Sequence, residues 1–235
     1  MGTGGVLHKS RKRIYQQGTT YFVTTVTHNR SPFFQDLHFA ELFVRDLSFA
    51  QSLKLFDLYG YAVLPNHAHL LLAPLGQSNI SDIAGTIKRN VSRDINCLIK
   101  GRPFIRNITN PFHLAADDSN RRLRGNFGIT REDHPHINFE TYTRHFSALE
   151  DIRQRFMATK VPNQSSPQFK WQKSFHDHII RDARDYDNHV AYIYNNAAKH
   201  HLVEDPADWP WMWVEGMDEP LLLSRDRVNP SSIPE

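Results

Sequence analysis

The chain has a single cysteine, Cys97, among its 235 residues. One thiol cannot form an intrachain disulfide or build a cysteine-based zinc site, so neither feature organises the fold. No apolar run is long enough to span a membrane, and the first residues lack the apolar stretch of a signal peptide. These absences predict an intracellular protein that does not act in a membrane.

Acidic residues are missing from the first 35 positions. The same segment carries the basic residues Lys9, Arg11, Lys12, Arg13 and Arg30. Further basic clusters follow at 88–102 and 121–124, although the formal net charge is only +3 and the pI is about 9.0. An uneven distribution of positive charge favours a polyanionic partner.

The spacing of apolar residues predicts a regular order of elements. Strands are expected at 20–27, 56–64, 67–74 and 175–181, and helices at 37–53, 79–100 and 182–202. Without residues 101–170 this order is that of an α+β fold with a ferredoxin-like, RRM-like βαββαβ core, an antiparallel sheet and an additional C-terminal helix.

The predicted domain organisation places residues 1–100 and 171–213 in one domain. Residues 101–170 are interpreted as an insertion with its own small core and one amphipathic helix, because a structureless loop of that length is rare in a compact domain. The tryptophan-rich stretch 209–213 is expected to be a loop pinned by its aromatic rings, and residues 214–235 a flexible tail.

Two histidines, His67 and His69, interrupt the apolar strand at 67–74. Alternation along a strand puts both imidazoles on one face, about 7 Å apart, with Ala68 on the other. The pair could lie on a solvated sheet face. Polar rings within so apolar a segment need a reason, however, and together they form half of a metal site.

The last predicted helix carries a second group of polar side chains. His189, Tyr192, Asn196 and Lys199 follow one helical face, and Tyr192 and Asn196 are one turn apart. A phenol, a carboxamide and an ammonium on one face suit phosphate chemistry. The alternative is that Tyr192 packs at the sheet edge and Asn196 merely approaches the helix C-terminus.

Several separated motifs, in order, resemble the REP-associated tyrosine transposases, which are single-tyrosine members of the His-hydrophobic-His (HUH) nuclease superfamily. These motifs are PNHAH at 65–69, WQK at 171–173, HIIRD at 178–182, HVAYIYNNAAKH at 189–200 and DWPW at 208–211. The chain departs from the family at Ala197, where proline is common, and in the length of 101–170.

The resemblance implies a metal-dependent DNA strand transferase. His67, His69 and Asn196 would hold Mg²⁺ or Mn²⁺, and Tyr192, assisted by the metal or by Lys199, would attack phosphorus to form a 5′-phosphotyrosine link. It also implies single-stranded or hairpin DNA as the partner, contacted by the basic N-terminal segment, a cytoplasmic, nucleoid-associated location in a bacterium, and a monomer or homodimer.

Two other functions remain open at this point. A relaxase or replication initiator would share the histidine pair, but such nickases often have two tyrosines or a third histidine. Tyr194 lies on a different helical face from Tyr192, which argues against a two-tyrosine site. A non-catalytic nucleic-acid-binding module would instead need aromatic residues where His67 and His69 stand.

Overall fold

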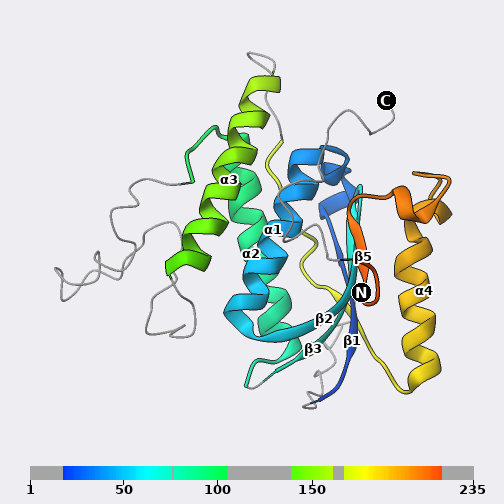
Figure 1. Ribbon diagram of the computed structural model, residues 1–235. Coiled ribbons are helices and arrows are strands. Elements are labelled where there is room, and N and C mark those ends of the chain that lie inside the picture. Colours follow the sequence, from blue (N-terminus) through cyan, green and yellow to red (C-terminus); the bar gives the residue numbers. More distant parts are fainter. Residues whose placement is uncertain (1–17, 76, 105–138, 161–166, 219–235) are drawn as a thin grey trace, which may run out of the picture.

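The computed structural model describes residues 18–75, 77–104, 139–160 and 167–218. Its strands are β1 (Tyr21–Val26), β2 (Phe56–Leu64), β3 (His67–Pro74), β4 (His176–Ile179) and β5 (Met212–Val214). They form one antiparallel sheet in the order β4-β1-β3-β2-β5 (Figure 1). The first four strands have the ferredoxin-like arrangement, so the predicted α+β fold class is confirmed.

The helices cover the two faces of the sheet unequally. The helices α1 (Leu37–Lys54), α2 (Ile80–Ile99) and α3 (Phe139–Thr159) lie on one side, and α4 (Ala183–Lys199) lies alone on the other (Figure 1). None of the helices in the described ranges is long and apolar enough to cross a membrane.

Side-chain caps fix where three of these helices begin. Asp36 accepts a hydrogen bond from His38 N at the start of α1, and Asn79 accepts from the second and third backbone N–H groups beyond it at the start of α2. Asp182 accepts from Asp185 N at the start of α4. Each cap satisfies backbone donors that the helix itself leaves unpaired, so the caps set the helix boundaries in the sequence.

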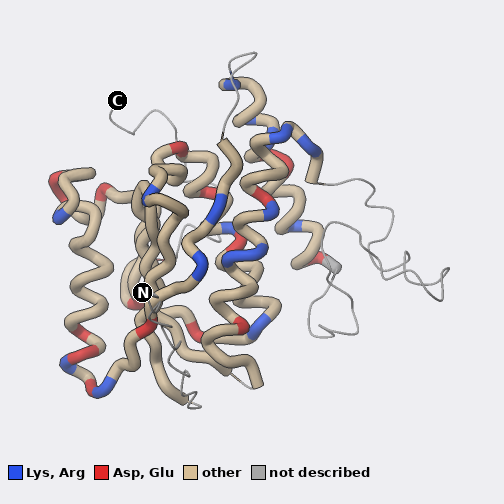
Figure 2. Tube along the Cα trace, turned by 180° about the vertical axis from the view of Figure 1, so that it is seen from behind, with Lys and Arg blue, Asp and Glu red and all other residues tan. Residues whose placement is uncertain are grey.

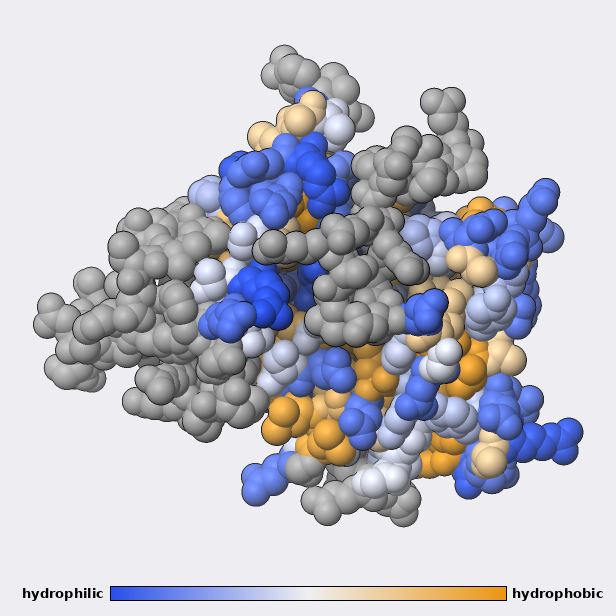
Figure 3. All heavy atoms as spheres, viewed as in Figure 1, coloured by the Kyte–Doolittle hydropathy of each residue, from blue (hydrophilic) through white to orange (hydrophobic). Residues whose placement is uncertain are grey.

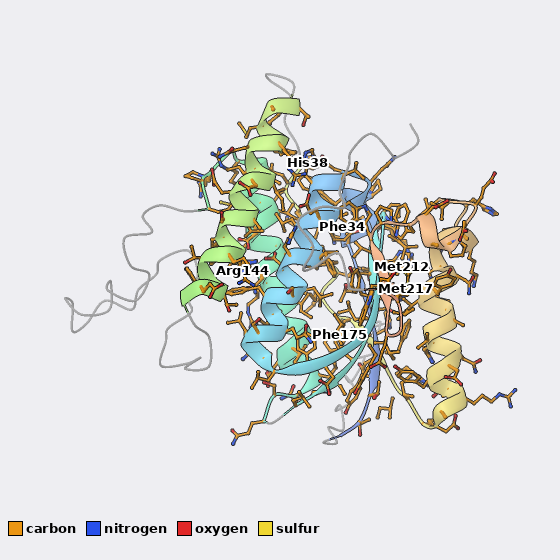
Figure 4. The ribbon with its side chains drawn as sticks, viewed as in Figure 1. Phe34, His38, Arg144, Phe175, Met212 and Met217 are labelled. Atoms are coloured by element: carbon orange, nitrogen blue, oxygen red, sulfur yellow. The ribbon has the colours of Figure 1, made fainter. Side chains whose placement is uncertain are left out.

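Strand β3 divides its side chains between two cores. Ala68, Leu70 and Leu72 point into the main core under α1 and α2, whereas Leu71 packs in a smaller core under α4. The buried members of this second core are Ala62, Leu64, Leu71, Ile193, Met212 and Val214. Figure 4 shows Met212 and Met217 on the α4 side of the sheet, and Figure 3 shows apolar residues at the surface near α4.

The helix predicted within 101–170 is present as α3, but it does not form a core of its own. Its buried residues Phe146, Leu149, Ile152 and Phe156 belong to the main core, together with Phe104. An amphipathic helix buries its apolar stripe against the nearest apolar surface, and here α1 supplies that surface. Residues 105–138 lie outside the described ranges.

The tryptophan-rich stretch is only in part the pinned loop that the sequence predicts. Trp209 Nε1 donates to the carbonyl oxygen of Val63 (3.0 Å), as a pinning side chain would. Met212–Val214, however, pairs with β2 as a fifth strand, and Val214 lies within the segment expected to be a tail. Residues 219–235 of that segment lie outside the described ranges.

Candidate active site

The strand pairing brings His67 and His69 to the centre of the sheet. On the β1 side, His69 is opposite Thr24 and His67 is opposite Val26. The two imidazole rings converge, with their centroids 4.8 Å apart and their planes at 82°. They share the sheet face that α4 covers, since Leu71, two residues further along the strand, packs against Ile193 in the smaller core.

Hydrogen bonds at Nδ1 hold both rings in place. His67 Nδ1 lies 2.6 Å from Asn66 Oδ1, and His69 Nδ1 lies 2.9 Å from Thr24 Oγ1. An Nδ1–H that donates to these oxygens leaves Nε2 as a bare nitrogen. His69 Nε2 is buried and has no hydrogen-bond partner among the described residues. Ligating histidines are commonly oriented by such a partner on the second nitrogen.

Both histidines are held in the neutral form. Burial lowers the pKa of His67 to about 4, with His200 and Arg30 as further causes. Burial lowers the pKa of His69 to about 3, followed by the effects of His67, His200 and His189. The neutral imidazole is the form that binds a metal ion, so the site needs no deprotonation at neutral pH.

Helix α4 adds Tyr192 and Asn196 to this face. The ring of Tyr192 lies 5.1 Å from that of His69, nearly edge-on at 78°, and Tyr192 is 37% exposed. Asn196 is fully buried, and neither its Oδ1 nor its Nδ2 has a hydrogen-bond partner in the described structure. Lys199 Nζ lies 5.4 Å from the centre of the Tyr192 ring. The structure therefore brings His67, His69 and Tyr192 together, with Lys199 over the Tyr192 ring, and Asn196 lies buried one turn further along α4.

The other tyrosines of α4 are engaged elsewhere. The hydroxyl of Tyr186 donates to Glu215 Oε2 (3.0 Å), and burial raises the pKa of that phenol. Tyr194 packs against the smaller core. Tyr192 is the α4 tyrosine whose ring contacts His69, as the helical face predicts.

His200 is a residue that the sequence analysis did not place in the site. Its ring lies 5.7 Å from that of His67, at 72°, and the residue is exposed at the C-cap of α4. The signal was present in the spacing, because His200 follows Asn196 by four residues and Tyr192 by eight on the same helical face.

Among the basic residues expected to contact a polyanion, Arg30 lies beside the site. It is exposed, and its charge helps to lower the pKa of His67. Asn29 and Arg30 both have positive φ angles (54° and 53°), a rare conformation for residues other than glycine that is found at functional sites. The predicted contacts Lys9, Arg11, Lys12 and Arg13 lie outside the described residues.

The basic cluster of α2 has internal partners. Lys88 Nζ donates to the carbonyl oxygens of Gln172 (2.8 Å) and Ser174 (3.0 Å), and Arg93 pairs with Asp94. Figure 2 shows that α4 carries Lys and Arg only near its ends, at Arg184 and Lys199. Arg30 acts on the pKa of His67, and Lys199 lies over the Tyr192 ring.

Two further groups of three side chains have potential metal-ligating atoms within 4.8 Å of one another. The first is His178, Asp185 and His189, next to the start of α4. His189 Nδ1 lies 2.8 Å from the carbonyl oxygen of Asp185, which can only accept a hydrogen bond. That nitrogen therefore carries a proton and is not available as a ligand.

The second group is Asp46, Asp94 and His145, buried among the helices on the opposite side of the sheet. Arg93 donates to both oxygens of Asp94, at 2.6 Å each. Two carboxylates and one guanidinium leave one negative charge, which a single proton on Asp46 balances. Burial and the neighbouring Asp94 raise the pKa of Asp46 well above its ordinary value, in agreement with that proton.

No family model matches the chain. A REP-associated tyrosine transposase of Haemophilus influenzae is 51% identical to it over 41 residues, which are 17% of this chain and 23% of that protein. The REP-associated tyrosine transposase of Escherichia coli K12 is 49% identical over 41 residues, 17% of this chain and 25% of its own. The chain resembles the REP-associated tyrosine transposases.

This confirms the resemblance seen in the motifs, over about a quarter of the length of these tyrosine transposases. A solved structure of a REP-associated tyrosine transposase bound to a REP hairpin aligns with a TM-score of 0.45. It is 18% identical, and the alignment covers 87% of this chain and 81% of that one.

Proposed function

We propose that this protein is a tyrosine transposase that cleaves and rejoins single-stranded or hairpin-flanking DNA. The observation that carries the proposal is the contact between Tyr192 and His69, which joins a potential nucleophile to a pair of converging neutral imidazoles. The similarity to REP-associated tyrosine transposases supports the same reaction class. Single-stranded DNA is the proposed substrate because its phosphates can reach a shallow sheet face.

The donor atoms of the site fit a divalent metal ion such as Mg²⁺ or Mn²⁺. His69 Nε2 and Asn196 Oδ1 are buried without hydrogen-bond partners among the described residues, and the ring of His67 converges on that of His69. Leaving such groups unpaired costs free energy that a bound ion would recover. We propose that His67, His69 and Asn196 hold the ion, which would polarise the scissile phosphate. The carbonyl oxygen of Asn196, water and the phosphate oxygens are the ligand types that Mg²⁺ and Mn²⁺ prefer, and three protein ligands would leave positions open for them.

In the proposed reaction Tyr192 Oη attacks phosphorus and forms the new P–O bond. The bond from phosphorus to the 3′-oxygen breaks, and the 3′-oxygen leaves as a hydroxyl after taking up a proton. A neutral phenol is a weak nucleophile. Lys199, whose ammonium lies over the Tyr192 ring, would stabilise the phenolate as the hydroxyl proton leaves. Because one diester is exchanged for another, the energy of the broken bond is kept for joining the end to a second strand.

The proposal is tested with a hairpin oligonucleotide that has randomised single-stranded flanks. A 5′-phosphotyrosine link retains the downstream fragment, so a 3′-labelled oligonucleotide gives a labelled protein adduct on a denaturing gel and a 5′-labelled one gives a shorter free product. Tyr192→Phe should eliminate the adduct, and the matched variant Tyr194→Phe should keep it. An adduct that is lost with Tyr194→Phe and survives Tyr192→Phe overturns the assignment of the nucleophile.

The metal assignment has its own test. The double variant His67→Ala/His69→Ala should lose Mg²⁺- or Mn²⁺-dependent cleavage and still bind the hairpin, because contacts to phosphates elsewhere supply the affinity. Cleavage by the double variant at the wild-type rate would refute the metal site. Joining of the held end to a second strand distinguishes a transposase from a nickase of the relaxase or initiator type, and a protein that binds without any cleavage is a non-catalytic module.

A further inference from the structure

A connected group of side chains behind the site has no role in the reaction proposed above. Strand β4 supplies His178 and the first turns of α4 supply Asp185 and His189. His178 Nε2 donates to Asp185 Oδ2 (2.9 Å), and Arg181 N donates to the same oxygen (3.1 Å). The hydrogen bond from His178 is the main cause that lowers the pKa of Asp185, so the carboxylate is charged. These bonds tie the start of α4 to the edge strand of the sheet.

His189 is fixed by the same carboxylate residue. Its Nδ1 donates to the carbonyl oxygen of Asp185 (2.8 Å) and lies 3.2 Å from Asp185 Oδ1. Its ring stacks on that of His178, with centroids 4.8 Å apart and planes at 21°. The orientation of the His189 ring is therefore determined by three contacts with two residues.

Phe22 connects this group to the site. The Phe22 ring contacts His189 on one side, with centroids 4.6 Å apart. It also stacks on His69, at 5.1 Å and 17°, and meets Tyr192 edge-on, at 5.7 Å and 84°. One aromatic ring thus touches the proposed metal ligand, the proposed nucleophile and His189.

We propose that His178, Asp185 and His189 are positioning residues that hold Tyr192 against His69 through the ring of Phe22. The inference rests on the proposed function, because it concerns the geometry of that reaction. Helix α4 needs such an anchor, since only Ile193, Asn196 and Ala197 are fully buried along its described length. A displacement of about 1 Å in a reacting group can lower a rate by about 100-fold.

The first test compares two aspartates of the same helix. Asp185→Ala should lower the maximal rate of adduct formation by about 10- to 100-fold, with the half-saturating DNA concentration unchanged, because Tyr192 is misplaced and the DNA contacts are not. Asp185→Asn keeps an acceptor oxygen for His178 and should recover most of the rate. Asp187→Ala removes an exposed carboxylate from the same helix and should leave the rate unchanged. Equal rates for Asp185→Ala and Asp187→Ala would overturn the proposal.

Two variants of His189 separate its hydrogen bond from its ring. His189→Asn can still donate to the carbonyl of Asp185, as Asn195 does to the carbonyl of Ala191 (2.8 Å) in this helix, but it lacks the ring that packs on Phe22. His189→Phe keeps the ring and loses the donor. If contact through Phe22 positions Tyr192, His189→Phe should retain more activity than His189→Asn. The opposite order would refute transmission through Phe22.

A readout without DNA distinguishes this inference from the proposed function. In protein labelled with 3-fluorotyrosine, the ¹⁹F resonance of Tyr192 is identified by its loss in Tyr192→Phe. Asp185→Ala and Phe22→Leu should shift or broaden it, and Asp187→Ala should not. If the resonance moves and the wild type forms no adduct, the positioning holds and the transposase proposal fails. If adducts form and the resonance stays fixed in both variants, the positioning fails and the transposase proposal stands.

Discussion

Replacing Asn196 with leucine should stabilise the metal-free protein while removing its activity. Asn196 is fully buried in α4, and its amide has no hydrogen-bond partner among the described residues. A buried polar group left unpaired costs about 1–3 kcal/mol, and leucine is a better helix former than asparagine by a few tenths of a kcal/mol. For a chain of this size, about 1–3 kcal/mol corresponds to a rise of roughly 2–12 °C in Tm.

The measurement is urea and thermal unfolding in the presence of EDTA, next to the adduct assay with Mn²⁺. Leucine is larger than asparagine and can overpack the site, so Asn196→Ala is measured in parallel; it removes the same amide without adding volume. Asn195→Leu is the matched control, since Asn195 is exposed on the same helix and its amide bonds to a backbone carbonyl. The control should show no comparable gain.

The opposite result has a clear meaning. If Asn196→Leu and Asn196→Ala both lower the free energy of unfolding by more than about 1 kcal/mol in EDTA, the buried amide stabilises the metal-free protein. The lack of a hydrogen-bond partner for Asn196 would then be no argument that it binds a metal ion. If both variants are stabilised and also form the adduct at the wild-type rate, Asn196 is not a metal ligand.

Three further predictions concern the framework of the site. Ile193→Ala, at a fully buried position of α4, should lower the free energy of unfolding by about 2–4 kcal/mol and speed up hydrogen exchange in α4 but not in α1 and α2. An equal increase in all three helices would show that the two cores open together. Gly60→Ala places a Cβ 3.1 Å from Val214 Cγ1, so the free energy of unfolding measured in urea should fall by about 1–3 kcal/mol. An unchanged urea midpoint would contradict this prediction. Burial lowers the pKa of His145 well below its ordinary 6.5, so the unfolded chain binds that proton first and stability should fall as pH drops below 6.5, by at most about 1.4 kcal/mol per pH unit. His145→Phe keeps the stacking on Phe49 and should weaken this pH dependence. If the free energy of unfolding of the wild type and the variant changes with pH in the same way, His145 does not contribute to the pH dependence.

The parts of the fold that sequence analysis predicts well are those with a strong local period. The bounds of β2 and β3 agree with the prediction, and the predicted ends of α1 and α2 are within one residue. Capping residues such as Asp36 and Asn79 mark these ends in the sequence itself. Strand β5 was missed because three residues are too few for an alternation to be seen, and because a preceding Pro210 favours a loop.

Tertiary packing limited the remaining predictions. The apolar stripe of α3 can be found from its spacing, but the sequence does not say that this stripe would join the main core and not form a separate one. For the candidate site, periodicity predicts that His67 and His69 share a strand face and that Tyr192 and Asn196 share a helix face. Phe22 does not, because its role depends on the register that sets β1 beside β3.

The two faces of the sheet differ in the kind of residue that they bury, and β3 contributes to both faces. Its residues facing α1 and α2 are apolar and fully buried, and they supply the stability that the fold needs. Its residues facing α4 include two histidines, and the Nε2 of His69 is buried without a hydrogen-bond partner among the described residues, which is unfavourable. The helix on that face has only three buried residues along its described length, so we expect the polar contact between His178 and Asp185 to contribute to its position. Because α4 packs in the smaller core, we expect that it can open locally to admit the proposed DNA substrate while the main core stays folded.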